Sequence, residues 1–302
     1  MIHAPPSGGE PGPLAREYAY TPEDFGHIAA LCHARAGIVL PPAKQDHVYS
    51  RLSRRLRALG LSTFSEYLRR LDGPEGVEEQ RQMISALTTN VTRFFREPHH
   101  FEHFSTQVLP DLVARARAGG RVRLWSAGCA SGEEPYSLAF TVLRALPEAA
   151  RCDLRILASD IDPEVLASAG KGQYSGEASA QMPAWVDAKM AVRGPDGMRI
   201  GDAARRIVDF RPLNLIRPFP MRGPFDAIFC RNVTIYFDAE TQQKVWTSFM
   251  GVMRPGSHLY IGHSERLPPA LAAQFTATCT TGYRMADETQ DPADAERRKT
   301  WR

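Results

Sequence analysis

The stretch SAGCASGEEPYSLA, residues 126–139, directly follows the run RVRLW at 121–125 and predicts a strand that turns sharply into a helix. Gly128 and Gly132 lie in this turn, which indicates backbone that approaches a ligand closely. The turn has neither the GxGxxG nor the GxxxxGK(S/T) spacing of phosphate-binding loops, and the adjacent carboxylates Glu133 and Glu134 would repel a phosphate. We therefore expect a ligand that lacks phosphate and carries cationic groups.

S-adenosylmethionine meets both conditions, since it carries a sulfonium, an ammonium and a ribose diol. We expect Glu134 to pair with the ammonium group. The strand LRILASD at 154–160 ends in Asp160, which is placed to accept hydrogen bonds from both ribose hydroxyls. Taken alone, a strand-terminal aspartate is as often a turn residue or helix cap, and Asp162, beside Pro163, is the better cap. The glycine turn upstream favours the cofactor interpretation of Asp160.

The composition is that of an ordinary globular protein of 302 residues, with 43% hydrophobic and 24% charged residues. Such a chain can bury a sizeable core, in one large and one smaller domain. It has no apolar stretch of roughly 18 residues and no secretory signal, so we expect a cytoplasmic location without membrane insertion. The net charge of +3 does not indicate nucleic-acid binding. The five cysteines are scattered and form no CxxC pair, which indicates neither disulfides nor a zinc site.

The two ends of the chain differ from its middle. Residues 1–16 are rich in Pro and Gly, and residues 287–302 are charged and poor in apolar residues, so both are predicted to be flexible tails. Residues 17–90 show only helical patterning and predict a small all-helical domain. Thr21 and Gly37 have the properties of the N-cap and the stop of its first helix.

From residue 121 on, short β-rich runs alternate with helical segments, which predicts a doubly wound α/β fold with a mostly parallel sheet. We expect this domain to span residues 91–286. An interruption at about 190–214, with a hairpin signal at Asp196–Gly197, predicts a small antiparallel β insertion. The β-rich runs are RVRLWSA (121–127), DLRILASD (153–160), FDAIFCRN (225–232) and SHLYIGHS (257–264).

Polar residues follow the third of these runs. Arg231 and Asn232 come directly after the apolar residues, and Tyr236 and Phe237 come soon after. Polar side chains at the end of a buried strand lie at the catalytic rim of an α/β domain, although they are also compatible with ordinary loop contacts. We favour a role in the site.

Five segments together resemble the CheR family, the chemotaxis-receptor methyltransferases that methylate glutamate side chains of bacterial chemoreceptors with S-adenosylmethionine. The resemblance extends over roughly residues 21–285. It implies a seven-stranded, Rossmann-like methyltransferase sheet preceded by a helical domain. The segments are LTTNVTRFFREPHHF (87–101), SAGCASGEEPYSLA (126–139), ILASDID (156–162), FDAIFCRNVTIYFD (225–238) and GHSE (262–265).

The resemblance implies a protein-glutamate O-methyltransferase that forms glutamate methyl esters during chemotaxis adaptation, with S-adenosylhomocysteine as product and no metal. It also implies association with receptor arrays at the inner face of the membrane. Two alternatives remain open: a non-catalytic S-adenosylmethionine-binding regulator or scaffold, and a methyltransferase of the same fold with another substrate. With Gly128, Glu134 and Asp160 included, the expected cofactor contacts are Asn90, Thr92, Arg96, Gly128, Glu134, Asp160, Asn214, Leu215, Arg231 and Asn232. Of these, Asn214 and Leu215 match the family's segment that lies along the adenine.

Arg96 and Tyr236 resemble the two residues that contact the methyl-accepting side chain. A glutamate carboxylate is already a nucleophile at neutral pH, so the reaction needs no strong general base. We expect Arg96 to hold the substrate carboxylate or the carboxyl group of the cofactor, and Tyr236 to orient the substrate through a hydrogen bond. The histidines His99, His100 and His103 suggest a metal site at first sight, but we expect packing or surface roles for them.

The segment KQDHVYSRLSRRLRALG, residues 44–60, predicts an amphipathic helix, with apolar residues at helical spacing from Val48 to Leu59. Its basic face is either a solvated surface or, given the acidic helical substrate that the resemblance implies, a docking surface; we favour docking. The β insertion of the family also binds a peptide from the receptor's C-terminal end. Here the tight loop RGPDGMR at 193–199 leads us to expect no such tether. The proposed docking residues are Arg51, Arg54, Arg55 and Arg57.

Overall fold

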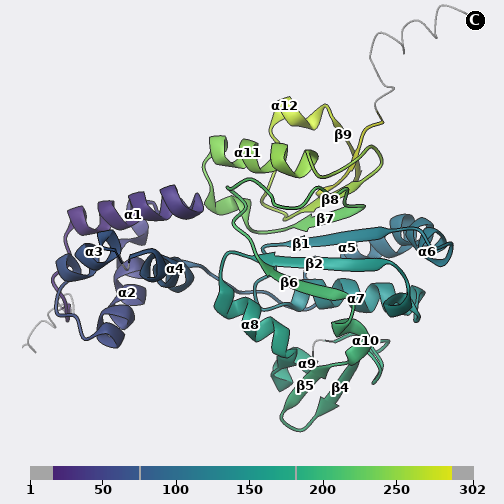
Figure 1. Ribbon diagram of the computed structural model, residues 1–302, viewed down its shortest axis with the longest axis horizontal. Helices are drawn as coiled ribbons and strands as arrows, with labels where there is room; N and C mark the ends of the chain where they lie inside the picture. Colours follow the sequence, from purple (N-terminus) through teal and green to yellow (C-terminus); the bar gives the residue numbers. More distant parts are fainter. Residues whose placement is uncertain (1–15, 75, 181, 288–302) are drawn as a thin grey trace, which may run out of the picture. The chain divides into compact units, whose positions relative to one another are not determined.

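The computed structural model describes residues 16–74, 76–180 and 182–287, which divide into two compact units (Figure 1). Unit 1 comprises the chain up to residue 34 together with residues 40–87, and unit 2 comprises residues 35–39 and the chain from residue 88 on. Apart from residues 16 and 287, the two predicted tails lie outside the described residues. No helix within the described ranges is both long enough and apolar enough to cross a membrane.

Unit 1 is all-helical, as predicted. The predicted first helix begins after Thr21, whose backbone N–H and hydroxyl both donate to Asp24, and it ends before Gly37, which has a φ of 74°. Thr63 and Glu66 form a reciprocal capping box at the start of the third helix. The helices are α1 (Pro22–Ala36), η1 (Pro42–Lys44), α2 (Gln45–Leu59), α3 (Phe64–Asp72) and α4 (Gly76–Leu87).

A buried ion pair joins α2 to α4 inside unit 1. Glu79 is 5% exposed, and its carboxylate accepts hydrogen bonds from Arg55 Nε at 3.1 Å and Nη2 at 2.7 Å. The hydroxyl of Tyr67, from α3, donates to the same carboxylate at 2.9 Å. A buried pair of charges is stable only when hydrogen bonds satisfy both partners, so these contacts fix the packing of three helices around one carboxylate.

Unit 2 contains a seven-stranded sheet of order β6-β2-β1-β7-β8-β10-β9. Only β10 runs antiparallel to its neighbours, and the order changes direction at β1, between β2 and β7. The predicted doubly wound α/β class is therefore confirmed. The strands are β1 (Val122–Ala127), β2 (Leu154–Asp160), β6 (Val208–Pro212), β7 (Ala227–Cys230), β8 (His258–Ile261), β9 (Phe275–Cys279) and β10 (Gly282–Met285).

Two apolar cores cover the two faces of this sheet. Alternation along β1 places Leu124 in one core and Trp125 in the other. Figure 1 shows α11 and α12 beside β8 and β9, and α7, α8 and α10 along β1, β2 and β6. The helical elements are α5 (Pro98–His103), the π-helical η2 (Phe104–Val108), α6 (Leu109–Arg117), α7 (Glu133–Ala145), η3 (Ala149–Arg151), α8 (Pro163–Lys171), α9 (Gly176–Ala180), α10 (Asp202–Arg205), η4 (Thr234–Tyr236), α11 (Ala239–Met250) and α12 (Pro269–Ala272).

The antiparallel β insertion is a second sheet of order β3-β5-β4, and its boundaries differ from the predicted 190–214. It contains β3 (Gln173–Tyr174), β4 (Ala191–Gly194) and β5 (Gly197–Ile200), with the predicted hairpin between β4 and β5. Residues 202–212 instead form α10 and the edge strand β6 of the large sheet. The sequence misleads at these points because a two-residue strand shows no periodicity and an edge strand alternates like a hairpin strand.

We predict that Glu79→Gln lowers the free energy of unfolding by about 2–4 kcal/mol, because it removes the charge of the buried carboxylate that binds Arg55 and Tyr67. Urea denaturation followed by circular dichroism measures this change. The matched control is the neighbouring Glu78→Gln, since Glu78 pairs with Arg81 on the surface with both side chains more than 60% exposed. The control should change stability by less than about 0.5 kcal/mol. Equal effects of the two substitutions would contradict the prediction.

Candidate functional site

The predicted site residues of unit 2 lie at the end of β2, at the start of α7, on the loops that follow β1, β6 and β7, and on the segment 88–97 that precedes α5. The carboxyl ends of parallel strands meet at one edge of a sheet, which is where ligands bind in open α/β folds. The loops at the carboxyl ends of β1, β2, β6 and β7 form this edge.

The glycines of the first turn are required by neighbouring side chains. Gly128 has a φ of 75°, and a Cβ there would lie 2.3 Å from Cγ2 of Val233. Gly132 has a φ of 98°, and a Cβ there would lie 2.8 Å from both Ala169 Cβ and the Tyr174 hydroxyl. The turn is thus packed between the loop after β7 on one side and α8 on the other.

Glu133 and Glu134 form the first turn of α7, at the positive end of its dipole. Burial raises the pKa of Glu133, although a hydrogen bond from Ser131 Oγ at 2.7 Å acts in the opposite direction. Because two carboxylates of its own already occupy this helix terminus, it does not offer the anion site that helix N-termini provide in phosphate-binding folds.

Glu134 and Arg231 form a buried ion pair across this edge. Arg231 Nε donates to Glu134 Oε2 at 2.6 Å, and Ser126 Oγ donates to Glu134 Oε1 at 2.7 Å. The Arg231 side chain is 2% exposed, its Nη1 also donates to the carbonyl of Arg96, and its guanidinium lies 5.3 Å from the ring centre of Phe101. The predicted residues Glu134, Arg231 and Arg96 are therefore brought together in one network.

Asp160 is buried at the end of β2, as predicted. Its carboxylate accepts hydrogen bonds from the backbone N–H groups of Ala130, at 2.9 Å, and Asp162, at 3.0 Å. Burial raises the pKa of Asp160, while these hydrogen bonds oppose the shift. Asp162 caps α8 through the N–H of Glu164 at 2.9 Å, which confirms the predicted cap, and it also accepts a hydrogen bond from Asn90 Nδ2 at 3.2 Å.

The segment 88–97 is tied to the strand ends at several points. Besides the contact of Asn90, the N–H of Phe95 donates to Ser137 Oγ at 2.9 Å. The side chain of Arg96 is half-buried and donates to the carbonyl of Val91 at 3.2 Å. Thr92 is half-buried in the same segment. These contacts hold the predicted Asn90, Thr92 and Arg96 at the edge that carries Asp160 and Glu134.

Strained backbone concentrates at this edge. Four non-glycine residues with positive φ lie in its loops: Phe95 (51°), Glu97 (56°), Ala130 (46°) and Asn232 (60°). Such conformations cost about 1–3 kcal/mol each and cluster at functional sites, where the surroundings enforce them. The distribution therefore supports the predicted location of the site.

Glu265 is a site residue for which the sequence predicted no role. It is 3% exposed, and its carboxylate accepts hydrogen bonds from the N–H groups of Asn232 at 2.9 Å, Val233 at 3.0 Å and Thr234 at 2.7 Å. It thereby fixes the loop after β7 that carries the predicted Asn232 and Tyr236. The GHSE motif was the available signal, but an acidic residue in a loop does not reveal that its partners are backbone amides about 30 residues away.

Asn232 and Tyr236 differ in what they offer to a ligand. Asn232 Oδ1 is buried and accepts no hydrogen bond from any described residue, so it is an acceptor available to a donor group. Tyr236 is 39% exposed, and its carbonyl accepts a hydrogen bond from Val39 at 2.8 Å. The phenol is accordingly presented at the surface from a fixed backbone.

The predicted adenine segment lies beside Asp160. The N–H of Leu213 donates to the carbonyl of Asp160 at 2.9 Å, and Asn214 Nδ2 donates to the carbonyl of Arg35 at 2.7 Å. Leu215 is 7% exposed and packs in the core that contains Trp125. Its side chain therefore serves mainly the core, and a role along the adenine stays a prediction for this segment.

The four predicted docking arginines all lie on α2 in unit 1, but they are not equivalent. Arg55 holds the buried Glu79, Arg51 Nη1 donates to the carbonyl of Ala86 at 3.4 Å, and Arg57 pairs with Glu17 at 3.1 Å on the surface. Arg54 is exposed and has no ionic partner among the described residues. The structure thus gives Arg55 a role in packing, and docking by Arg54 stays a prediction.

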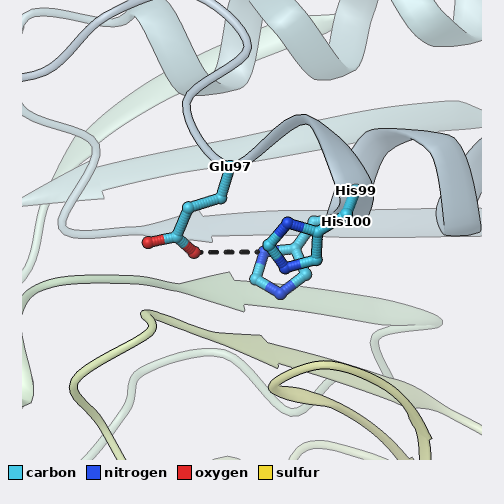
Figure 2. A group of neighbouring side chains, drawn as sticks. All are labelled: Glu97, His99 and His100. Carbon is cyan, nitrogen blue, oxygen red and sulfur yellow. Dashed lines mark ion pairs between the residues drawn. The ribbon is translucent and has the colours of Figure 1, made fainter.

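Glu97, His99 and His100 place one potential metal-ligand atom each within 4.8 Å of one another (Figure 2). Arg231 Nη1, however, lies 3.5 Å from His100 Nδ1 and 3.7 Å from Glu97 Oε2. His263 Nδ1 contacts the other oxygen of Glu97 at 3.1 Å. Since a guanidinium already supplies positive charge at this point, the arrangement favours a charge network, and the absence of a metal stays our prediction.

His100 is a buried neutral histidine in this network. Its Nε2 lies 2.9 Å from the carbonyl of Thr280, which only accepts, so Nε2 carries the proton and Nδ1 presents its lone pair to Arg231. Burial, and then the positive charge of Arg231, lower the pKa of His100 to about 3. The predicted packing role of this histidine agrees with that environment.

The residues at this edge fit S-adenosylmethionine by their donor and acceptor chemistry. The cofactor offers an ammonium, a sulfonium and two ribose hydroxyls. The edge offers the carboxylates of Glu134 and Asp160 and the unpartnered Asn232 Oδ1. An ionised carboxylate has about four lone-pair sites, so each of these carboxylates retains acceptor capacity beyond the hydrogen bonds described.

Comparison with known proteins agrees with this chemistry. Residues 23–88 match the family model described as CheR methyltransferase, all-alpha domain, and residues 90–283 match CheR methyltransferase, SAM binding domain. A probable chemotaxis protein methyltransferase of Rhizobium etli is 47% identical over 84% of this chain and 96% of its own length. The chemotaxis protein methyltransferase of Escherichia coli is 40% identical over 91% of this chain and 95% of its own length.

We predict that Gly128→Ala lowers the free energy of unfolding by about 2–4 kcal/mol, through the positive φ and the contact with Val233. Chemical denaturation of a double-mutant cycle separates the two causes. Val233→Ala removes the contact but leaves the φ unchanged, so Gly128→Ala should cost less in the Val233→Ala background. An equal cost in both backgrounds would show that the contact is unimportant.

We also predict a pH dependence of stability that originates in His100. Its pKa is about 3 in the folded protein against 6.5 ordinarily, so the folded state binds fewer protons than the unfolded chain between these values. The free energy of unfolding therefore falls as the pH falls through this window.

His100→Gln should reduce the slope between about pH 6.5 and pH 4 by up to about 1.4 kcal/mol per pH unit. Urea titrations across this range measure the slope, with His33→Gln as the control because His33 is exposed and lies on α1, outside the network around His100. An unchanged slope in His100→Gln would refute the assignment.

Proposed function

Because the chain belongs to the CheR family, it is a chemotaxis protein methyltransferase that depends on S-adenosylmethionine, and we propose that its methyl acceptors are glutamate side chains in the cytoplasmic helical domain of bacterial chemoreceptors. The products are glutamate methyl esters and S-adenosylhomocysteine. The observation that supports this proposal best is the chemistry at the carboxyl ends of the strands. The carboxylates of Glu133 and Glu134 stand at the start of α7, and Asn232 Oδ1 supplies an amide acceptor. That edge suits a cationic cofactor without phosphate.

The reaction requires positioning more than acid–base chemistry. When bound, S-adenosylmethionine supplies a methyl group on a sulfonium. The substrate carboxylate oxygen forms the new O–C bond while the C–S bond breaks, and the electron pair of that bond stays on sulfur. Since the carboxylate is ionised at neutral pH, no residue has to remove a proton. The protein contributes by aligning the carboxylate oxygen with the methyl group and by excluding other orientations of the substrate.

Arg96 and Tyr236 are the residues that we assign to the substrate. Arg96 is anchored through its own carbonyl, which Arg231 Nη1 binds, while its half-buried guanidinium retains donors beyond the one bonded to Val91. We propose that these donors hold a carboxylate, either of the substrate or of the cofactor. The exposed phenol of Tyr236 would orient the accepting carboxylate with a hydrogen bond.

Asp160, Glu134 and Asn232 are the residues that we assign to the cofactor most directly. Asp160 would accept the ribose hydroxyls through lone pairs not used by the turn at residue 130. Glu134 would receive the ammonium beside its bond to Arg231. The orphaned Asn232 Oδ1 supplies a further acceptor.

We propose that Arg54 on α2 docks the acidic receptor helices, because it is exposed and uncommitted among the described residues. The loop between β4 and β5 spans only two residues, and we assign no receptor tether to it. A position at the cytoplasmic face of receptor arrays follows from this choice of substrate. A cofactor-binding scaffold and a methyltransferase with another substrate remain the competing functions.

The experiment that tests this proposal incubates the full chain with methyl-labelled S-adenosylmethionine and receptor cytoplasmic fragments. We expect base-labile methyl ester on glutamate. Tight binding of S-adenosylhomocysteine without any label would favour the scaffold. Label in another protein of a cell extract, with none in the receptor fragments, would favour a different substrate.

Two variants separate the roles. Asp160→Asn should weaken binding of S-adenosylhomocysteine by at least about tenfold, the loss of one charge-assisted hydrogen bond, with Asp153→Asn at the opposite end of β2 as control.

Arg54→Glu should raise KM for the receptor fragment with cofactor affinity unchanged, and the exposed Arg69→Glu on α3 should not. Equal KM values for the two arginine variants would remove the docking assignment.

A further inference from the structure

A groove of about 450 Å³ lies on one face of the large sheet, over β1, β2 and β6. It extends from Arg121, which precedes β1, past Arg155 near the amino end of β2 to Arg211 near the carboxyl end of β6. The site described above lies on the loops after the carboxyl ends. Five arginines and a single aspartate line the groove: Arg121, Arg123, Arg155, Arg211, Arg222 and Asp209.

The strand register places like charges side by side on this face. Arg123 on β1 is directly opposite Arg155 on β2, and Leu157 on β2 is directly opposite Asp209 on β6. Like charges directly opposite one another destabilise a sheet. Because Asp153 pairs with Arg123, an anion bound on this face would neutralise chiefly Arg155.

The groove exists because the connection from β6 to β7 contains no helix. In most parallel sheets such a crossover is helical and covers the face beneath it. Here Phe219 and Phe225 pack on Trp125 at ring-centre distances of 5.1 Å, and Arg121 Nη2 binds the carbonyl of Gly223 at 3.0 Å. The connection thus covers the middle of the sheet and leaves the arginines of the groove accessible.

Little negative charge balances the groove. Arg123 pairs with Asp153, whereas Arg155 Nη1 donates to the carbonyl of Leu154 at 2.7 Å. Within the described part of the chain, Arg155, Arg211 and Arg222 form no ion pair. A concave surface lined by one sign of charge concentrates the field and attracts counter-ions.

The lining also has an apolar part, here called the floor, which consists of Leu157, Met221 and Phe225. A ligand can place an uncharged ring system against the floor while its anionic groups contact the guanidiniums. Sites of about 300–1,000 Å³ with an apolar lining and a few charged groups are typical of small-molecule binding. Guanidiniums bind phosphate oxygens with two parallel hydrogen bonds, which favours a phosphate ester.

We propose that this groove binds a soluble nucleotide, with the phosphates held by Arg155 and Arg211 and the base placed over the apolar floor. This binding is separate from the methyl-donor site and does not depend on the methyl acceptor proposed above. The concave shape favours a small ligand over a flat lipid surface.

The test titrates ATP into the full chain by calorimetry, with the cofactor site saturated with S-adenosylhomocysteine so that the adenine of ATP cannot enter it. We expect binding that weakens with salt, competition by inorganic pyrophosphate, and no binding of adenosine. The double variant Arg155→Gln/Arg211→Gln should lose at least about tenfold in ATP affinity. The control double variant Arg69→Gln/Arg151→Gln removes two exposed arginines outside the groove and should retain affinity within about twofold.

Unchanged affinity for S-adenosylhomocysteine and a melting temperature no lower than that of the wild type show that each variant is folded. The proposal is overturned if the wild type binds neither ATP nor GTP under these conditions, or if both double variants lose affinity equally. Cosedimentation with phosphatidylglycerol vesicles in the absence of nucleotide binding would assign the groove to a membrane surface instead and also overturn it.

Discussion

The buried ion pair between Glu134 and Arg231 is the constraint on which the functional edge depends. Burying two charges costs several kcal/mol per ion unless further hydrogen bonds satisfy both groups. Ser126 satisfies the carboxylate, and the carbonyl of Arg96 satisfies the guanidinium. These requirements force three segments together: the start of α7, the end of β7 and the segment before α5. Residues far apart in the chain therefore lie together, because separating the two buried charges would cost several kcal/mol.

A second buried carboxylate completes this geometry. Glu265 binds three consecutive backbone amides of the loop after β7, and this hydrogen bonding stabilises the positive φ of Asn232 in the loop. With Arg231 held by Glu134 at one end of the loop and residues 232–234 held by Glu265, Tyr236 projects from a fixed backbone. Precise placement of an exposed phenol is what an orientation-dependent methyl transfer requires.

The sequence was sufficient to predict the fold class, the main strands and the cap at Asp162, because these depend on local periodicity and capping chemistry. It was insufficient where the partner is remote. Arg55 looked like a surface residue, and only its pairing with Glu79 on another helix shows that it is a packing residue. The role of Glu265 and the two-residue strand β3 were missed for the same reason, since neither has a local pattern.

The connection between β6 and β7 links the two polar regions of unit 2. At its start, Leu213 binds the carbonyl of Asp160 and so brings Asn214 to the edge that carries Asp160. Further on, the absence of a helix leaves the face that carries Arg155 uncovered. A helical crossover would bury that face and require apolar residues where arginines stand. The same irregular segment therefore contributes to an acceptor-rich edge at the carboxyl ends of the strands and to a cationic groove on one face of the sheet.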